Sequence, residues 1–105
     1  MVFVQTVGFD QLSKEDMSHF ESLFNNHFKK IQRKIKDAET FVFHLKEYEK
    51  EGKRMKFSLH SRIIWGNKMI EANAFDWEFN KTVNKVFNKL EQEIEHKFRD
   101  QEHSK

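Results

Sequence analysis

Histidine side chains are the first groups in this sequence that could carry out chemistry. The chain has six histidines and no cysteine, so thiolate metal sites and disulfides are not available. His44 and His60 lie on the same side of two segments that are expected to pair as strands, so their rings can lie close together. No carboxylate at a suitable spacing joins them, and a structural zinc site usually needs four ligands. We therefore expect surface histidines here, with no metal and no other cofactor.

Catalytic motifs are not visible in the sequence. A Gly-x-Ser-x-Gly elbow, a phosphate-binding loop and a dinucleotide-binding glycine pattern are all missing, and the chain has only three glycines. Acidic residues are plentiful, but most fall beside lysines on expected helix surfaces, and none stand out as a pair placed for acid–base work. The sequence therefore predicts a protein that is not an enzyme and has no small-molecule substrate.

Basic residues are the remaining candidates, because they gather on two segments. Residues 29–36 contain five basic residues and no acid, and residues 81–99 place cations at helical spacing. Such surfaces can follow a phosphate backbone. A charged helix face is also commonly just a solvated surface, and the helix dipole favours cations near a C-terminal end. Both interpretations stay open on this pattern alone.

The elements that position these residues follow from the spacing of apolar side chains. Alternating or β-branched stretches predict four strands, at residues 2–7, 40–48, 55–65 and 69–75. Apolar residues three and four positions apart predict two helices, at residues 14–36 after an N-cap at Ser13 and up to about residue 99 after an N-cap at Asp76. The charged segment 49–54, which contains Gly52, is expected to be a hairpin loop.

The order β-α-β-β-β-α predicts the fold class. Each helix has one apolar stripe, and a half-buried four-stranded sheet can cover both. We therefore expect an α/β (α+β) two-layer sandwich with both helices on one face of the sheet. Residues 1–100 are expected to form one domain, and residues 101–105 a polar tail. No apolar run approaches the roughly 20 residues that span a bilayer, and the N-terminus lacks a signal-peptide pattern, so we expect a cytoplasmic protein without a membrane partner.

Helical geometry gathers the cations opposite the apolar stripes. At about 100° per residue, the stripe of the second helix centres near Leu90. The basic ridges that lie opposite consist of Lys29, Lys30, Arg33 and Lys36 on the first helix and Lys81, Lys85, Lys89, His96 and Arg99 on the second. His27 borders the first apolar stripe and is expected to be partly buried. Trp65 and Trp77 could stack on bases, but we favour their closing the ends of the core.

Several short strings resemble one protein family. Residues 43–50, Phe-His-Leu-Lys-Glu-Tyr-Glu-Lys, resemble that family's apolar strand ending in Leu-Lys and a charged loop. Residues 86–94, Val-Phe-Asn-Lys-Leu-Glu-Gln-Glu-Ile, resemble its last helix, where an apolar pair precedes Asp-Lys-Leu and Arg-Gln-Leu. Residues 27–31, His-Phe-Lys-Lys-Ile, resemble its Lys-Phe-x-Lys-Leu, and His96-Lys97 falls where the family continues with basic residues.

The family is that of the short ribosome hibernation factors, the hibernation-promoting factor and ribosome-associated inhibitor A group, also called sigma-54 modulation proteins. The resemblance covers nearly the whole chain in the order of its expected elements and in its length. It is the resemblance of a distant member of the family. The chain departs from the family at residues 78–84, where the family has Asp-x-Tyr-x-Ala-Ile-Asp, at Gln92, where it has Arg, and around residues 63–68. Longer members carry a further C-terminal domain, so the resemblance implies the short form.

The resemblance implies a function. Such factors bind the small ribosomal subunit in the channel used by messenger RNA and tRNA anticodon stems, and so stop translation and preserve the ribosome under stress. Basic residues on both helices contact rRNA phosphates. By motif position this role carries over to Lys29, Lys30, Lys89, His96 and Lys97, and the ridges add Arg33, Lys81, Lys85 and Arg99. We expect a monomer whose partner is small-subunit rRNA.

Two alternatives remain. The chain could bind another structured RNA, as double-stranded-RNA-binding domains do with helices packed on one face of a sheet. It could also be a protein-interaction module that uses the open sheet face or an edge strand. Salt dependence separates RNA binding from an apolar protein interface, because each neutralised phosphate adds a slope of about −0.7 to −0.9 in log K against log salt.

Overall fold

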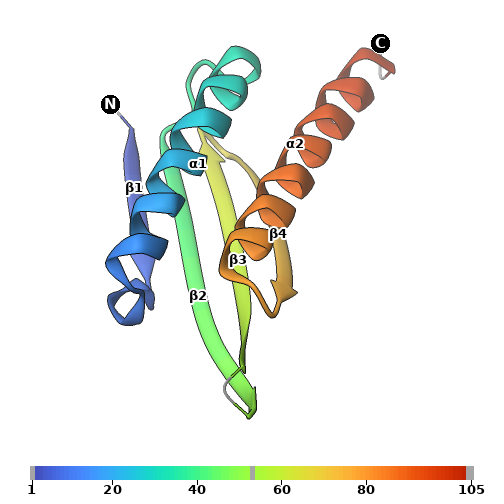
Figure 1. Cartoon of the computed structure of the whole chain (residues 1–105). Coiled ribbons are helices and arrows are strands. Elements are labelled where there is room, and N and C mark those ends of the chain that lie inside the picture. Colours follow the sequence, from blue (N-terminus) through green and yellow to red (C-terminus); the bar gives the residue numbers. More distant parts are fainter. Residues whose placement is uncertain (1, 53, 104–105) are drawn as a thin grey trace.

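The computed structural model describes residues 2–52 and 54–103, without the side chains of residues 48–51, 54 and 98–103 (Figure 1). Its elements follow the predicted order, with one short 3₁₀ turn added. They are β1 (Phe3–Val7), η1 (Phe9–Gln11), α1 (Lys14–Lys34), β2 (Thr40–Glu51), β3 (Arg54–Trp65), β4 (Lys68–Asp76) and α2 (Phe79–His103). No helix among the described residues combines the length and the apolar character that crossing a lipid bilayer requires.

The four strands form one mixed sheet in the order β1-β2-β3-β4. Strand β1 pairs in parallel with β2, and the other two pairings are antiparallel. Parallel neighbours need a long crossover, which α1 supplies. Both helices lie on one face of the sheet and the other face is open (Figure 1). The predicted two-layer α+β fold is therefore confirmed.

The core lies between the sheet and the two helices. Alternate residues of β2 and β3 point into it, and Phe41, Phe43, Leu59 and Ile63 are completely buried. Leu90 is also completely buried, which confirms the predicted apolar stripe of α2. The predicted burial of the aromatic ring at Trp65 is confirmed as well, since only 8% of that residue is exposed.

The predicted hairpin between β2 and β3 is confirmed, but its loop is shorter than the predicted residues 49–54. The antiparallel ladder between β2 and β3 continues to the pair Glu51 and Arg54, with a register shift between Tyr48 and Lys50. This end of the hairpin projects beyond the helix layer (Figure 1). Because no helix covers it, the hairpin can carry charged residues while the backbone bonds still form. The outward position predicted for the Tyr48 side chain lies outside the described side chains.

The helix boundaries also differ from those predicted. Helix α1 ends at Lys34, two residues early, and Ile35 leaves helical geometry while its N–H still bonds to the carbonyl of Ile31. Its start is as predicted, since the Ser13 side chain accepts a hydrogen bond from the N–H of Asp16. Helix α2 runs to His103, so the segment expected to be a polar tail is helical as far as the structure describes it.

Candidate nucleic-acid interface

The C-terminal half of α1 presents the basic residues 29–36 to solvent. Lys29, Lys30 and Arg33 are exposed, and none of the three has a hydrogen-bond or ion-pair partner among the described residues. The opposite side of the helix fixes this orientation, because Phe20 and Ile31 are buried against the sheet. The three side chains are therefore free to bind anions such as phosphate groups.

The two helices run side by side and are joined by polar contacts along their length. Near their N-terminal ends the Asn80 amide donates to Nδ1 of His19 at 3.2 Å. Near their C-terminal ends Lys34 Nζ lies 3.2 Å from Glu95 Oε1. These contacts hold α2 beside α1 and so define the groove between the helices, next to the basic segment of α1.

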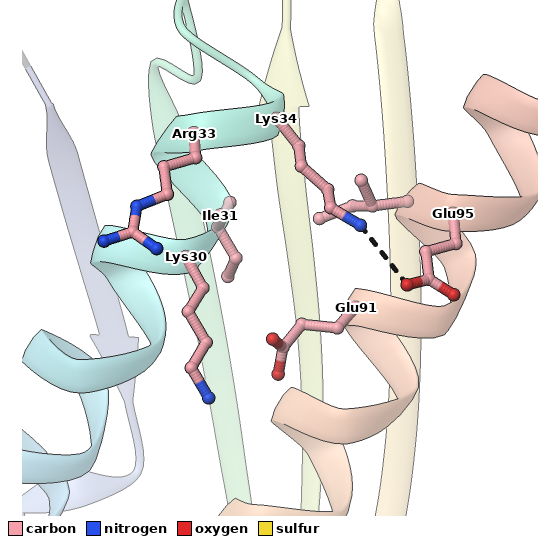
Figure 2. A pocket seen from close by; sticks show the side chains of 7 residues that line it. Lys30, Ile31, Arg33, Lys34, Glu91 and Glu95 are labelled. Atoms are coloured by element: carbon pink, nitrogen blue, oxygen red, sulfur yellow. Dashed lines mark hydrogen bonds and ion pairs between the residues drawn. The ribbon is translucent and has the colours of Figure 1, made fainter.

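A shallow cavity of about 230 Å³ opens in this groove between the C-terminal halves of the helices. The α1 wall carries cations and the α2 wall carries acids, as Figure 2 shows. Lys34 reaches across to Glu95, whereas Arg33 points away from α2. The carboxylates of Glu91 and Glu95 would repel a phosphate in this groove, so Arg33, which points away from α2, is better placed to meet an anion than Lys30, which lines the groove with the two acids.

His27 lies between the helices, and its predicted partial burial is confirmed, with 12% of its side chain exposed. Its ring stacks on that of Phe87 with centroids 4.5 Å apart, and Nδ1 donates to the carboxylate of Glu91 at 3.0 Å. The ring therefore joins α1 to α2 through one apolar and one polar contact. This is a structural role.

Lys85 and Lys89 of α2 turn toward β4, and Lys81 turns toward the segment just before α2, so none of the three turns toward α1. Lys81 forms an ion pair with Glu78 at 2.7 Å, and Lys85 forms one with Asp76 at 2.8 Å. Lys89 donates to the backbone carbonyl of Asn73 at 2.8 Å. The two predicted basic ridges are thus separated by the acidic flank of α2.

Strand β4 is an edge strand, and two of these lysines bond to its backbone carbonyls. Lys85 donates to the carbonyl of Phe75 at 3.5 Å, in addition to its ion pair, and Lys89 donates to that of Asn73. Lysines over an edge strand hinder the addition of another strand. Lys85 and Lys89 therefore already have a structural role, which an RNA contact would have to share.

Asp76 anchors the start of α2. Its carboxylate accepts hydrogen bonds from Lys85 and from the backbone N–H of Glu78, and these bonds hold the pKa of Asp76 below its ordinary value. The hydrogen bond to Glu78 raises the pKa of Lys81. The N-cap predicted at Asp76 is wrong in position, because the helix begins at Phe79 and its cap position is Glu78, whose N–H donates to Asp76 just before the helix.

The remaining predicted site residues lie near the end of α2. His96 is exposed and Lys97 is half-buried. The side chain of Arg99 lies outside the described side chains. His96 has no hydrogen-bond or ion-pair partner in the part of the chain that the structure describes.

The predicted proximity of His44 and His60 is confirmed, because the two residues are direct partners in the β2–β3 ladder. A carboxylate does reach this pair, contrary to expectation, since Nε2 of His60 donates to Glu71 at 3.1 Å. Among the side chains that the structure describes, no three histidine or acidic groups are placed so that they could hold a metal ion.

Comparison with known proteins places the fold. No protein-family model and no curated protein matches the sequence. A ribosomal subunit interface protein from Coxiella burnetii has a similar structure, with a TM-score of 0.68 and 17% sequence identity over 94% of this chain and 99% of that one. The Protein Y N-terminal domain from Thermus thermophilus matches with a TM-score of 0.54 and 9% identity over 90% of this chain and 96% of that one.

Both similarities extend over nearly the full length of each protein, so they concern the whole β-α-β-β-β-α arrangement. The fold that the sequence resemblance implied is confirmed by two solved structures. The chain has the fold of a ribosomal subunit interface protein and of a Protein Y N-terminal domain.

Proposed function

We propose that the chain is a short, distant member of the ribosome hibernation factor group and that it binds the small ribosomal subunit through rRNA. In this role it is a cytoplasmic, monomeric protein without enzymatic activity. Three independent features support the proposal: the short strings shared with the family, the fold shared with a ribosomal subunit interface protein, and the cations of α1.

The observation that carries the proposal is the exposed basic segment of α1. Lys29, Lys30 and Arg33 project from a helix whose other side is fixed in the core, and the described part of the chain offers them no partner. Cations held on a rigid element can match a fixed row of phosphates without losing further backbone freedom. Binding would release counterions from the RNA, so it would be sensitive to salt.

The cations of α2 form the second part of the proposed interface. Lys81, Lys85 and Lys89 are exposed, and their internal partners are near the surface. Exposed ion pairs contribute little to stability, so a phosphate can replace the internal acceptor with only a small loss of free energy. We include His96 and Lys97 by motif position, and Arg99 by its helical spacing in the sequence, as further cations toward the C-terminus. We expect α2 to contribute less affinity than α1, because its lysines must exchange one partner for another.

The proposed mechanism is occupation of a site. The domain would lie in the channel of the small subunit that messenger RNA and tRNA anticodon stems use, with its basic helix surfaces against rRNA phosphates. No covalent step is needed, because a bound protein excludes tRNA and messenger RNA by volume alone. Translation would stop while the domain is bound, and would resume when it dissociates.

Replacing Lys29, Lys30 and Arg33 with glutamine is expected to weaken binding to isolated small subunits at least tenfold at moderate salt. Each lost phosphate contact lowers the slope of log K against log salt by about 0.7–0.9, so the triple variant should lose about 2–3 units of slope. Fluorescence anisotropy of labelled protein, titrated with subunits at several salt concentrations, measures both quantities.

Two further variants serve as controls. The matched triple variant at Lys81, Lys85 and Lys89 removes the same charge from α2 and should lose less affinity. Lys14→Gln, at the exposed opposite end of α1, should bind as the wild type does. An α1 triple variant with wild-type affinity and slope would contradict the proposal. A small slope in the wild-type protein itself would favour a protein-interaction module.

A further inference from the structure

The open face of the sheet differs in charge from α2. Helix α2 contains five basic and five acidic residues, so its charges balance. The strands, by contrast, present Lys46, Lys56 and Arg62 on the open face against a single acid, Glu71, among the side chains that the structure describes. That acid is already bonded to His60. The open face is therefore basic across the two central strands.

An exposed aromatic ring adjoins these cations. Phe75 projects from β4 with 58% of its surface exposed. The ammonium group of Lys56 lies 4.6 Å from the centre of its ring. Phe75, Ser58 and Lys46 are neighbours across three strands, which puts Lys46 roughly 10 Å from Phe75 along the sheet. The ring and these two cations thus form one surface, which we name the Phe75 patch: Phe75, Lys46 and Lys56.

A second aromatic residue on the same face provides a natural comparison. Phe3 of β1 is 60% exposed, almost the same as Phe75. Its register partner is Thr40, and β1 carries no charged residue. The two rings therefore match in type, exposure and face, but only Phe75 lies among cations.

We propose that the Phe75 patch binds a single-stranded RNA segment. A base would stack on Phe75 while Lys46 and Lys56 contact the neighbouring phosphates. Aromatic rings that accept bases, set in a basic surface that follows the backbone, are the usual combination for single-stranded nucleic acids. Duplex RNA fits this patch less well, because its bases are already stacked on each other and cannot reach the ring.

Leu45 and Ala74, the strand neighbours of Lys46 and Phe75, are buried in the core, so this surface lies on the sheet face that α1 and α2 leave open (Figure 1). It is therefore separate from the proposed helix interface, and the inference does not depend on ribosome binding. A protein with both surfaces can contact one RNA element through its helices and a single strand through its sheet.

The test uses the purified chain and a fluorescein-labelled oligouridylate, which does not form secondary structure. Phe75→Ala is expected to weaken binding about tenfold or more, which is within the range measured for loss of one base-stacking ring. Phe75→Trp should retain the affinity, because the larger ring also stacks. Phe3→Ala is the matched control and should bind as the wild type does. A duplex RNA of the same length should compete poorly.

Three results would overturn the inference: unchanged affinity in Phe75→Ala, equal losses in Phe75→Ala and Phe3→Ala, or stronger binding of the duplex than of the single strand. The helix proposal can fail separately. The effect of Phe75→Ala on oligouridylate binding is expected to persist in the α1 triple variant. If ribosome binding is absent and the Phe75 effect is present, only the helix proposal is wrong.

Discussion

Gly8→Ala is expected to lower the free energy of unfolding by roughly 3–5 kcal/mol. The loss comes from backbone strain at residue 8 and from displacement of the buried side chain of Phe9. Gly8 has φ 83, in the left-handed region, where a Cβ costs about 1–2 kcal/mol. A Cβ there would also overlap the backbone carbonyl oxygen of Leu45. Leu45 belongs to a paired central strand and cannot move aside, so the chain at Gly8 must shift instead.

That shift would disturb Phe9, the next residue. Only 7% of Phe9 is exposed, and its ring packs edge-on against Phe20 with centroids 4.8 Å apart. Gly66→Ala is the matched control, because Gly66 also has a positive φ, of 57, but a Cβ there would have no neighbour within 4 Å. It should lose only the backbone strain, about 1–2 kcal/mol. Urea unfolding measures both, and equal losses in the two variants would refute the close approach at Leu45.

Phe43→Ala is expected to destabilise the protein by about 3–5 kcal/mol, the usual range for removing a buried aromatic ring. Phe43 is completely buried in β2. Its ring lies 5.1 Å from that of Phe20 on α1 and 5.7 Å from that of Phe87 on α2, so it joins both helices to the sheet. Because small domains are stable by only about 5–15 kcal/mol, this one change should remove a large part of the total.

The control for this prediction is Phe75→Ala, which removes the same side chain from the exposed face. Its loss should stay within about 0.5 kcal/mol, as for most surface substitutions. Thermal or urea unfolding followed by circular dichroism compares the two variants with the wild type. A Phe43→Ala variant that unfolds at the wild-type midpoint would show that the aromatic cluster does not hold the helices on the sheet.

The sequence predicted the fold where one face of an element must be buried. In β2 the alternation of Phe41, Phe43 and Leu45 marks the buried side, and all three are in the core. Leu90 was placed at the centre of the α2 stripe in the same way and is completely buried. These patterns are readable because burial repeats every second residue in a strand and every three or four in a helix.

The prediction failed where no such requirement exists. The hairpin end between Glu51 and Arg54 is held by backbone hydrogen bonds and is not covered by a helix, so its charged side chains looked like a loop. The left-handed conformation of Gly8 could not be predicted from its neighbours in the sequence either, because it is required by the close approach of Leu45, which is distant in the sequence. Strand pairing sets both features, and periodicity does not report it.

In the candidate site, too, some features could be predicted from the sequence and others could not. Angular position on a helix predicted that Lys29, Lys30 and Arg33 are exposed, and they are. The same reasoning could not show that Lys89 bonds to the carbonyl of Asn73, because a helical wheel does not say which strand lies beside the helix. The basic open face of the sheet was likewise missed, since its charges come together only through the register of the sheet strands.

The proposal that this domain binds the small ribosomal subunit is tested most directly by co-sedimentation of the wild-type chain with ribosomes and separated subunits on sucrose gradients, at low and moderate salt. We expect the protein to migrate with the small subunit and the whole ribosome. Salt should reduce this comigration, and added tRNA should displace the protein. Protein that stays at the top of the gradient under every condition would contradict the proposed function, while the fold would be unaffected.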